Sequence, residues 1–113
     1  AGWHVPTDEE WTDLEFYLMT NGFSLTAASA LKTTNGWDDD GNGTDDFGFS
    51  GQPSGQRTHT GGNFTGAERY GYWWSSSPNG DQAWYRRLSY DNSDILRSDE
   101  YPRSGQSVRC IQD

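Results

Sequence analysis

The chain has 113 residues, and its 17 acidic and 8 basic side chains give a formal net charge of −9. We expect no nucleic-acid partner, because a phosphate backbone requires a basic footprint that this chain lacks. No apolar run approaches the ~18 residues of a membrane span, so we expect no direct membrane insertion. Only 31% of the residues are hydrophobic but 15% are aromatic, which predicts a core built on rings in a single domain over residues 1–113.

The first third of the chain predicts two helices. Thr7 and Glu10 have the spacing of a capping box, and they predict a helix over residues 8–19. From Trp11 onward, apolar residues recur at helical spacing. A second helix is expected over residues 26–33, which are mostly strong helix formers. An Asn-Gly pair follows each segment and marks its end.

Residues 36–71 are expected to form a long irregular loop region. They are rich in Gly, Asp, Asn and Thr, which favour turns and loops. We expect the aromatic residues of this region to hold it against the core; they are Trp37, Phe47, Phe49 and Phe64.

The last part of the chain predicts a small antiparallel sheet. Strands are expected over residues 72–77, 82–90, 94–98 and 106–112. A strong turn signal, Pro-Asn-Gly-Asp, separates the first two of these segments. Because two helices precede the strands, the predicted fold class is α+β.

The chain has one cysteine, Cys110, and two histidines, His4 and His59. A single cysteine excludes an internal disulfide and a cysteine-based zinc site. Two interpretations of Cys110 stay open: a buried small hydrophobic residue, or half of a disulfide whose partner lies outside this chain. The histidines are far apart in sequence and are expected to be structural. We therefore expect no enzymatic activity.

Oxygen ligands recur in the acidic segment of the irregular region. Asp38, Asp40 and Asn42 occupy alternate positions and Asp46 follows, which matches the front half of a calcium loop. Phe49 stands where such loops carry a bidentate glutamate, and no helices are expected to flank the segment. Two alternatives follow. One is a calcium site formed by the four oxygen-bearing residues, and the other is a solvent-exposed turn rich in Asp and Gly.

Alternate residues of the strand 82–90 face opposite sides of the sheet, so Tyr85 and Arg87 share one face. Arginine beside exposed tyrosine or tryptophan is typical of protein-recognition surfaces, and rings with polar neighbours also suit sugars. The alternative is an ordinary solvated sheet face with its loop. The candidate ligand-binding residues are Tyr85, Arg87, Tyr90, Asp91, Asn92, Arg97, Asp99 and Tyr101.

Several segments match the motifs of one known family in the same order. They are residues 2–11 (GWHVPTDEEW), 31–32 (LK), 43–49 (GTDDFGF), 72–76 (YWWSS), 83–86 (AWYR) and 107–110 (SVRC). With this set the chain resembles the Fibrobacter succinogenes major paralogous domain over essentially its whole length. The resemblance implies a C-type-lectin-like fold on exported, often lipid-anchored proteins of Bacteroidota-like bacteria. It also implies a cysteine before Ala1 as the partner of Cys110, because family members carry Cys-Pro there.

Three hypotheses for the function follow. The preferred one is a non-catalytic extracellular or cell-surface recognition module, monomeric as an isolated domain, that binds a glycan or surface protein through its C-terminal sheet and loops. An acidic, lysine-poor composition is typical of exported modules. The second is a variable display protein of a diversity-generating retroelement, because residues 84–103 are rich in Tyr, Asn, Asp, Ser and Arg. The third is a structural spacer of a multidomain surface protein.

Overall fold

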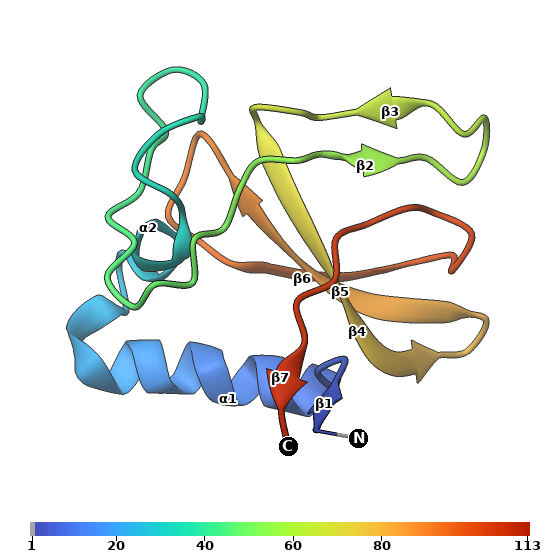
Figure 1. Ribbon diagram of the computed structural model, residues 1–113, viewed down its shortest axis with the longest axis horizontal. Helices are drawn as coiled ribbons and strands as arrows, with labels where there is room; N and C mark the ends of the chain where they lie inside the picture. Colours follow the sequence, from blue (N-terminus) through green and yellow to red (C-terminus); the bar gives the residue numbers. More distant parts are fainter. Residues whose placement is uncertain (1) are drawn as a thin grey trace.

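Helix α1 (Asp8–Leu18) lies across one face of a three-stranded antiparallel sheet in the computed structural model, which describes residues 2–113 (Figure 1). The sheet has the order β4-β5-β6, with β4 (Tyr70–Asn79) at one edge and β6 (Leu96–Glu100) at the other. Its central strand is β5 (Gln82–Ser89). The predicted α+β class is therefore confirmed. None of the helices within the described residues is long and apolar enough to cross a membrane.

The helical segments begin and end close to the predicted residues. The hydroxyl of Thr7 accepts a hydrogen bond from the Glu10 backbone at 3.1 Å, and the Glu10 carboxylate accepts one from the Thr7 backbone at 3.0 Å, which completes the capping box. A short π-helical segment, η1 (Met19–Phe23), follows α1 and contains Gly22, whose φ of 93° lies outside the helical range. The second helix, α2 (Ala27–Leu31), is shorter than predicted.

The predicted meander is confirmed in β4, β5 and β6. Asn79 faces Gln82 across a tight turn, as the Pro-Asn-Gly-Asp signal predicts. The third strand starts at Leu96, two residues later than expected. Cross-strand pairing places Trp73 beside Arg86 on the face covered by α1, and Trp74 beside Tyr85 on the opposite face.

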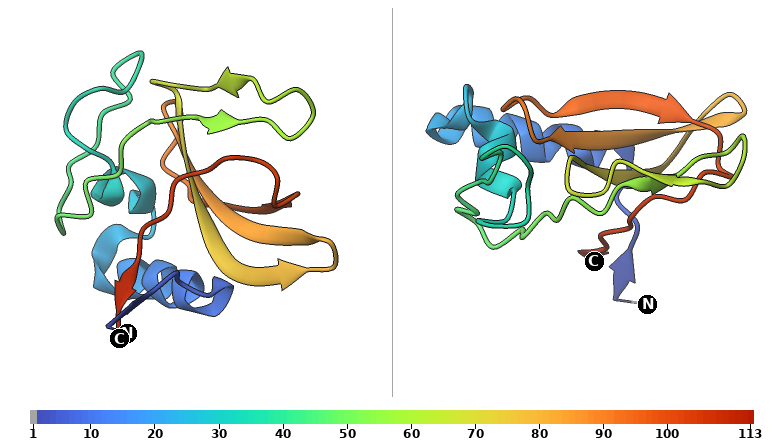
Figure 2. Two further views of the ribbon diagram at one scale, coloured as in Figure 1. Left: turned by 45° about the vertical axis from the view of Figure 1, so that its right-hand side comes forward. Right: turned by 90° about the horizontal axis from the view of Figure 1, so that it is seen from above.

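The predicted last strand, residues 106–112, is wrong in extent and in partner. Only β7 (Ile111–Gln112) is a strand, and it pairs with β1 (Trp3–His4) instead of joining the meander. The residues before it run past β4, where the Ser107 backbone donates to the Tyr72 carbonyl at 3.0 Å. The two ends of the chain consequently lie side by side (Figure 2).

The irregular region contains a hairpin that the sequence did not predict. It pairs β2 (Gln56–Arg57) with β3 (Phe64–Thr65). Its β3 strand carries Phe64, which is 85% exposed, so the expectation that this ring holds the region against the core is wrong. Phe47 is also exposed, although its ring contacts the ring of Phe23 edge-on. Strands of two residues are too short to show an alternating pattern.

Aromatic rings form much of the core, as predicted. Trp11, Trp37 and Trp73 are buried together with Leu18 and other small or aliphatic residues. Phe49 is half-buried and links helix to sheet, because its ring lies edge-on to Trp11 at 6.1 Å and to Trp73 at 5.7 Å. The low hydrophobic fraction is thus compatible with a packed interior.

Candidate functional site

The eight predicted ligand-binding residues do not form one site. The structure divides them between the contact of α1 with the sheet, the opposite face of the sheet, and the two ends of β6. Arg97 lies in the first place, Tyr85 and Arg87 in the second, and Asp91, Asn92, Asp99 and Tyr101 in the third. Tyr90 follows β5 and packs against both the Tyr70 ring and the core.

Arg97 is held by helix α1. Its guanidinium donates to the Asp8 carboxylate at 2.7 Å and lies 3.6 Å from the centre of the Trp84 ring. Arg86, its cross-strand neighbour, also donates to Asp8 at 2.6 Å. Hydrogen bonds from Arg97 above all, and from Arg86, hold the pKa of Asp8 below its ordinary value. Arg97 thus positions the helix on the sheet through its Nε and Nη2, while its side chain stays 45% exposed.

On the face of the sheet away from α1, three tyrosines and one tryptophan form a series of ring contacts, and the ring of Tyr90, which follows β5 and also packs against the core, extends it. We call it the tyrosine row, and it consists of Trp74, Tyr85, Tyr72, Tyr70 and Tyr90. Successive ring centres are 6.3, 5.8, 6.1 and 6.0 Å apart. All members except Tyr72 are partly exposed, and burial raises the pKa of the Tyr72 hydroxyl.

Two arginines flank the tyrosine row. Arg87 lies 4.8 Å from the centre of the Tyr70 ring, and Arg69 lies 5.6 Å from the centre of the Tyr90 ring. The Nε of Arg87 is buried and has no hydrogen-bond partner within residues 2–113. A buried donor without an acceptor is uncommon in folded proteins.

Sequence reasoning placed Tyr85 and Arg87 on one face correctly but missed the members of the row on β4. Tyr72 faces Arg87 and Trp74 faces Tyr85 across the strand pair. The alternation Tyr-x-Tyr-x-Trp over residues 70–74 carries the signal, because alternate strand residues share a face. Combining it with the strand register would have identified the row.

The remaining predicted residues lie away from the row. Asn92 caps the turn between β5 and β6 by accepting from the Asp94 backbone at 2.9 Å, beside Asp91, which accepts from the Ser89 hydroxyl. At the other end of β6, Asp99 accepts from Asn79 at 2.7 Å. Tyr101 follows β6, and its ring contacts the ring of His59 with centres 4.9 Å apart.

The predicted calcium ligands are engaged in separate contacts. Asp38 pairs with Arg69 at 3.3 Å, Asn42 accepts from the Trp37 backbone at 2.9 Å, and Asp46 accepts from the Thr44 hydroxyl. Asp40 is exposed, with a φ of 58° that is typical of a turn. Over residues 2–113 no three His, Cys, Asp or Glu side chains come together as metal ligands. Calcium binding by this segment stays a prediction to which the geometry adds no support.

Cys110 is exposed, so its interpretation as a buried hydrophobic residue is wrong. It directly precedes β7, whose residue Ile111 pairs with His4 near the start of the chain. The predicted disulfide to a cysteine before Ala1 concerns residues outside the described structure and stays a prediction.

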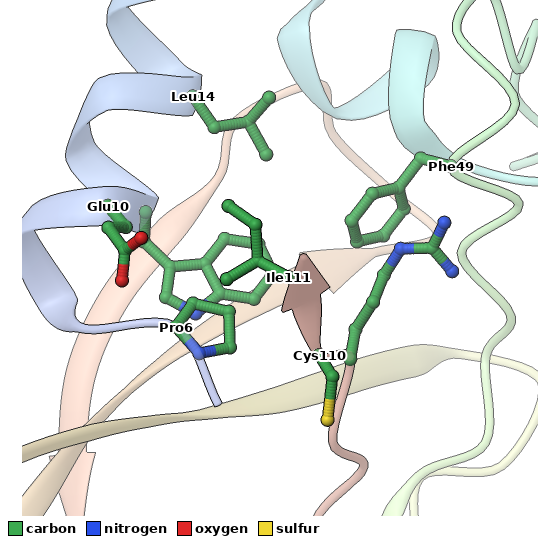
Figure 3. Close-up of a pocket in the computed structure, with 8 residues that line it drawn as sticks. Pro6, Glu10, Leu14, Phe49, Cys110 and Ile111 are labelled. Carbon is green, nitrogen blue, oxygen red and sulfur yellow. The ribbon is translucent and has the colours of Figure 1, made fainter. Parts of the chain in front are cut away.

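An apolar cavity of about 200 Å³ lies between α1, the irregular region and β7. Figure 3 shows Leu14 and Glu10 on the helix side, Phe49 on the opposite side and Ile111 between them. Its lining residues are Pro6, Glu10, Trp11, Leu14, Phe49, Arg109, Cys110 and Ile111. We call it the α1–β7 pocket. No sequence pattern predicted it, because its walls come from three distant segments.

The charges at the α1–β7 pocket differ in how they are paired. Glu10 accepts from the Thr7 backbone and, at 2.9 Å, from His4 Nε2, while His4 Nδ1 contacts Asp113 at 2.7 Å. These contacts, with Asp113 first and Glu10 second, raise the pKa of His4. Arg109 lies 4.4 Å from the centre of the Phe49 ring and forms no ion pair with any residue the structure describes.

The family model of the Fibrobacter succinogenes major domain matches residues 1–112. The chain belongs to this family. The resemblance inferred from the sequence motifs is therefore confirmed. No curated protein and no solved structure matches the chain.

Three of the motif segments that mark the Fibrobacter succinogenes major domain in this chain meet at the α1–β7 pocket. Residues 2–11 contribute Pro6, Glu10 and Trp11 to its wall. Residues 43–49 contribute the ring of Phe49, and residues 107–110 contribute Arg109 and Cys110. The tyrosine row likewise draws its rings partly from the motif segments on β4 and β5.

Proposed function

We propose that this domain is a non-catalytic recognition module of the cell surface or extracellular space, and that it binds a glycan or a surface protein through the tyrosine row. The observation that carries the proposal is a series of partly exposed rings flanked by two arginines. Arginine and tyrosine are the residue types that dominate binding energy at recognition surfaces.

The chemistry of the row suits both ligand classes. Partly exposed rings can stack on the C–H face of a sugar or on apolar side chains of a protein, and the guanidinium of Arg87 can donate to a hydroxyl, carbonyl or carboxylate. Tyr72 is buried beneath its neighbours and supports them. Tyr85, Tyr70 and Tyr90 supply the accessible ring surface.

We further propose that the α+β fold is C-type-lectin-like. Support comes from the two N-terminal helices, the small antiparallel sheet, the long irregular region and the pairing of the chain ends through β1 and β7. An acidic chain with one lysine favours an exported location. The display alternative is weaker, because the run of residues 84–103 includes Arg86 and Arg97, which anchor helix α1.

A glycan array and a pull-down with surface proteins, both carried out with the intact domain, test the proposal. Tyr85→Ser and Arg87→Gln should each weaken any captured ligand more than about tenfold, as removal of central interface residues does. Tyr17→Ser is the matched control, because Tyr17 is an exposed tyrosine of helix α1 away from the row. Unchanged binding in both row variants would place the ligand elsewhere and contradict the proposal.

A further inference from the structure

The α1–β7 pocket has the features of a second binding site, separate from the tyrosine row. We propose that it receives one apolar side chain of a partner protein, and that Arg109 pairs with a carboxylate of the partner beside that side chain. The inference does not depend on the proposed function of the row, because the two sites share no residue.

The size and lining of the pocket favour a single side chain. Its volume of about 200 Å³ lies below the ~300–1,000 Å³ of typical small-molecule sites. Trp11, Leu14, Phe49 and Ile111 supply apolar walls, and the indole N–H of Trp11 is directed to the Trp74 carbonyl at 3.4 Å. A sugar would lose the hydrogen bonds of its hydroxyls in such a cavity, whereas a Leu or Phe side chain needs none.

The charges at the pocket favour an acidic neighbour on the partner. Glu10 already accepts from His4 and from the Thr7 backbone, so its negative charge is compensated within the domain. The Arg109 guanidinium is exposed, stacks on Phe49 and has no carboxylate partner within residues 2–113. A cation beside an apolar cavity, in a chain with a net charge of −9, is complementary to an Asp or Glu next to an apolar residue.

The surroundings of the pocket favour a protein segment as the occupant. Apolar anchors that enter a pocket, with an arginine at the rim, are the usual high-energy contacts of protein interfaces. The pocket also adjoins β7, which pairs with β1 alone among the strands that the structure describes. An extended segment of a partner can therefore lie next to β7 while one of its side chains fills the cavity.

Three small probes separate the contribution of the apolar side chain to binding in the α1–β7 pocket from the contribution of the carboxylate. N-acetyl-phenylalanine carries a ring and a carboxylate, its amide carries only the ring, and N-acetyl-alanine carries only the carboxylate. Titrated into the ¹⁵N-labelled domain to about 20 mM, which fills a site with a millimolar Kd, the first probe should shift the NMR signals of the Cys110 and Ile111 amides. It should bind about two- to fivefold more tightly than the amide, and N-acetyl-alanine should not bind.

Variants of two exposed arginines, Arg109 and Arg103, complete the experiment. Arg109→Gln should abolish the preference for the carboxylate, while Arg109→Lys should retain it. Arg103→Gln is the matched control, because Arg103 also lies beside a ring, that of Tyr101, but away from the pocket. The proposal is overturned if no probe shifts pocket signals, if N-acetyl-alanine binds as well as N-acetyl-phenylalanine, or if Arg109→Gln keeps the preference. Tyr85→Ser should leave probe binding unchanged, so failure of one site is distinguishable from failure of the other.

Discussion

Arg86 and Asp8 join the centre of the sheet to the first turn of helix α1. The Arg86 side chain is 1% exposed and donates from Nη1 to the Asp8 carboxylate at 2.6 Å. Glu15, two turns along the same helix, accepts from Arg86 Nε at 2.8 Å. Because the negative charge of Asp8 also suits the N-terminus of the helix, one carboxylate serves both the helix and its contact with the sheet.

We predict that Asp8→Asn lowers the free energy of unfolding by about 3 kcal/mol, because loss of one partner leaves a buried charge incompletely compensated. The substitution also removes the charge that Arg97 contacts at 2.7 Å. Urea denaturation followed by tryptophan fluorescence measures the change. Asp13→Asn is the control, since Asp13 lies exposed on the same helix, and it should change stability by less than about 0.5 kcal/mol. Equal effects of the two variants would contradict the prediction.

The parts of the fold that depend on neighbouring residues could be predicted from the sequence. Thr7 and Glu10 are three residues apart, and their capping box starts α1 where expected. The pairing of Trp3 with Gln112 could not be predicted, because it joins opposite ends of the chain and two residues are too few for a pattern. Phe64 was misassigned for a related reason, since burial of a ring in a loop depends on where the loop folds.

The candidate site likewise could be predicted only where it depends on residues close together in the sequence. Alternation along β5 predicted the shared face of Tyr85 and Arg87, but the rings of Tyr70 and Tyr72 join them only through the register of β4. Arginine is a residue type typical of ligand-binding surfaces, which is why Arg97 was predicted to bind a ligand. Its contact with Asp8 depends instead on where helix α1 packs. Sequence spacing identifies which residues share a strand face, and tertiary packing decides which of them remain accessible.

Gly43→Ala should destabilise the domain by about 3 kcal/mol. A Cβ at Gly43 would overlap the Ser29 carbonyl and lie 2.5 Å from the Lys32 Cβ, and backbone atoms cannot rotate away. Gly61→Ala is the matched control, because there a Cβ would meet only the flexible Asn63 side chain, at 3.2 Å. Gly61→Ala should change the free energy of unfolding by less than about 1 kcal/mol, and urea denaturation measures both variants. A well-tolerated Gly43→Ala would contradict the packing described for this segment.

Calcium should leave the Tm unchanged. Asp38 already pairs with Arg69, and Asn42 accepts from the Trp37 backbone, so calcium would have to compete with both contacts. A ligand at 100 times its Kd stabilises a protein by about 2.7 kcal/mol, which a thermal melt in calcium against a chelator detects readily. A rise in Tm that Asp40→Asn abolishes would instead support the calcium loop predicted from the sequence.

The contacts of His4 predict a pH dependence of stability. Asp113 and Glu10 raise the pKa of His4 above its ordinary value of 6.5, so the folded state binds the proton more tightly than the unfolded state. This stabilisation is complete below pH 6.5 and is lost as the pH rises through the raised pKa of the folded state. The His4 hydrogen bond lowers the pKa of Asp113, and hydrogen bonds from the Thr7 backbone first and His4 second lower the pKa of Glu10. The contribution of the two carboxylates is therefore lost on acidification below their ordinary values of 3.8 and 4.5.

The difference in urea midpoint between the unmodified domain and His4→Gln should therefore be largest between about pH 5 and 6.5 and decrease towards pH 9. Asp113→Asn retains the histidine and Glu10 but removes the negative charge that His4 contacts at 2.7 Å, so it should show part of the same decrease. Urea titrations at half-unit pH intervals measure both curves. A difference that stays constant, or that grows as the pH rises, would show that the protonated imidazole does not hold the start of the chain against helix α1 and Asp113.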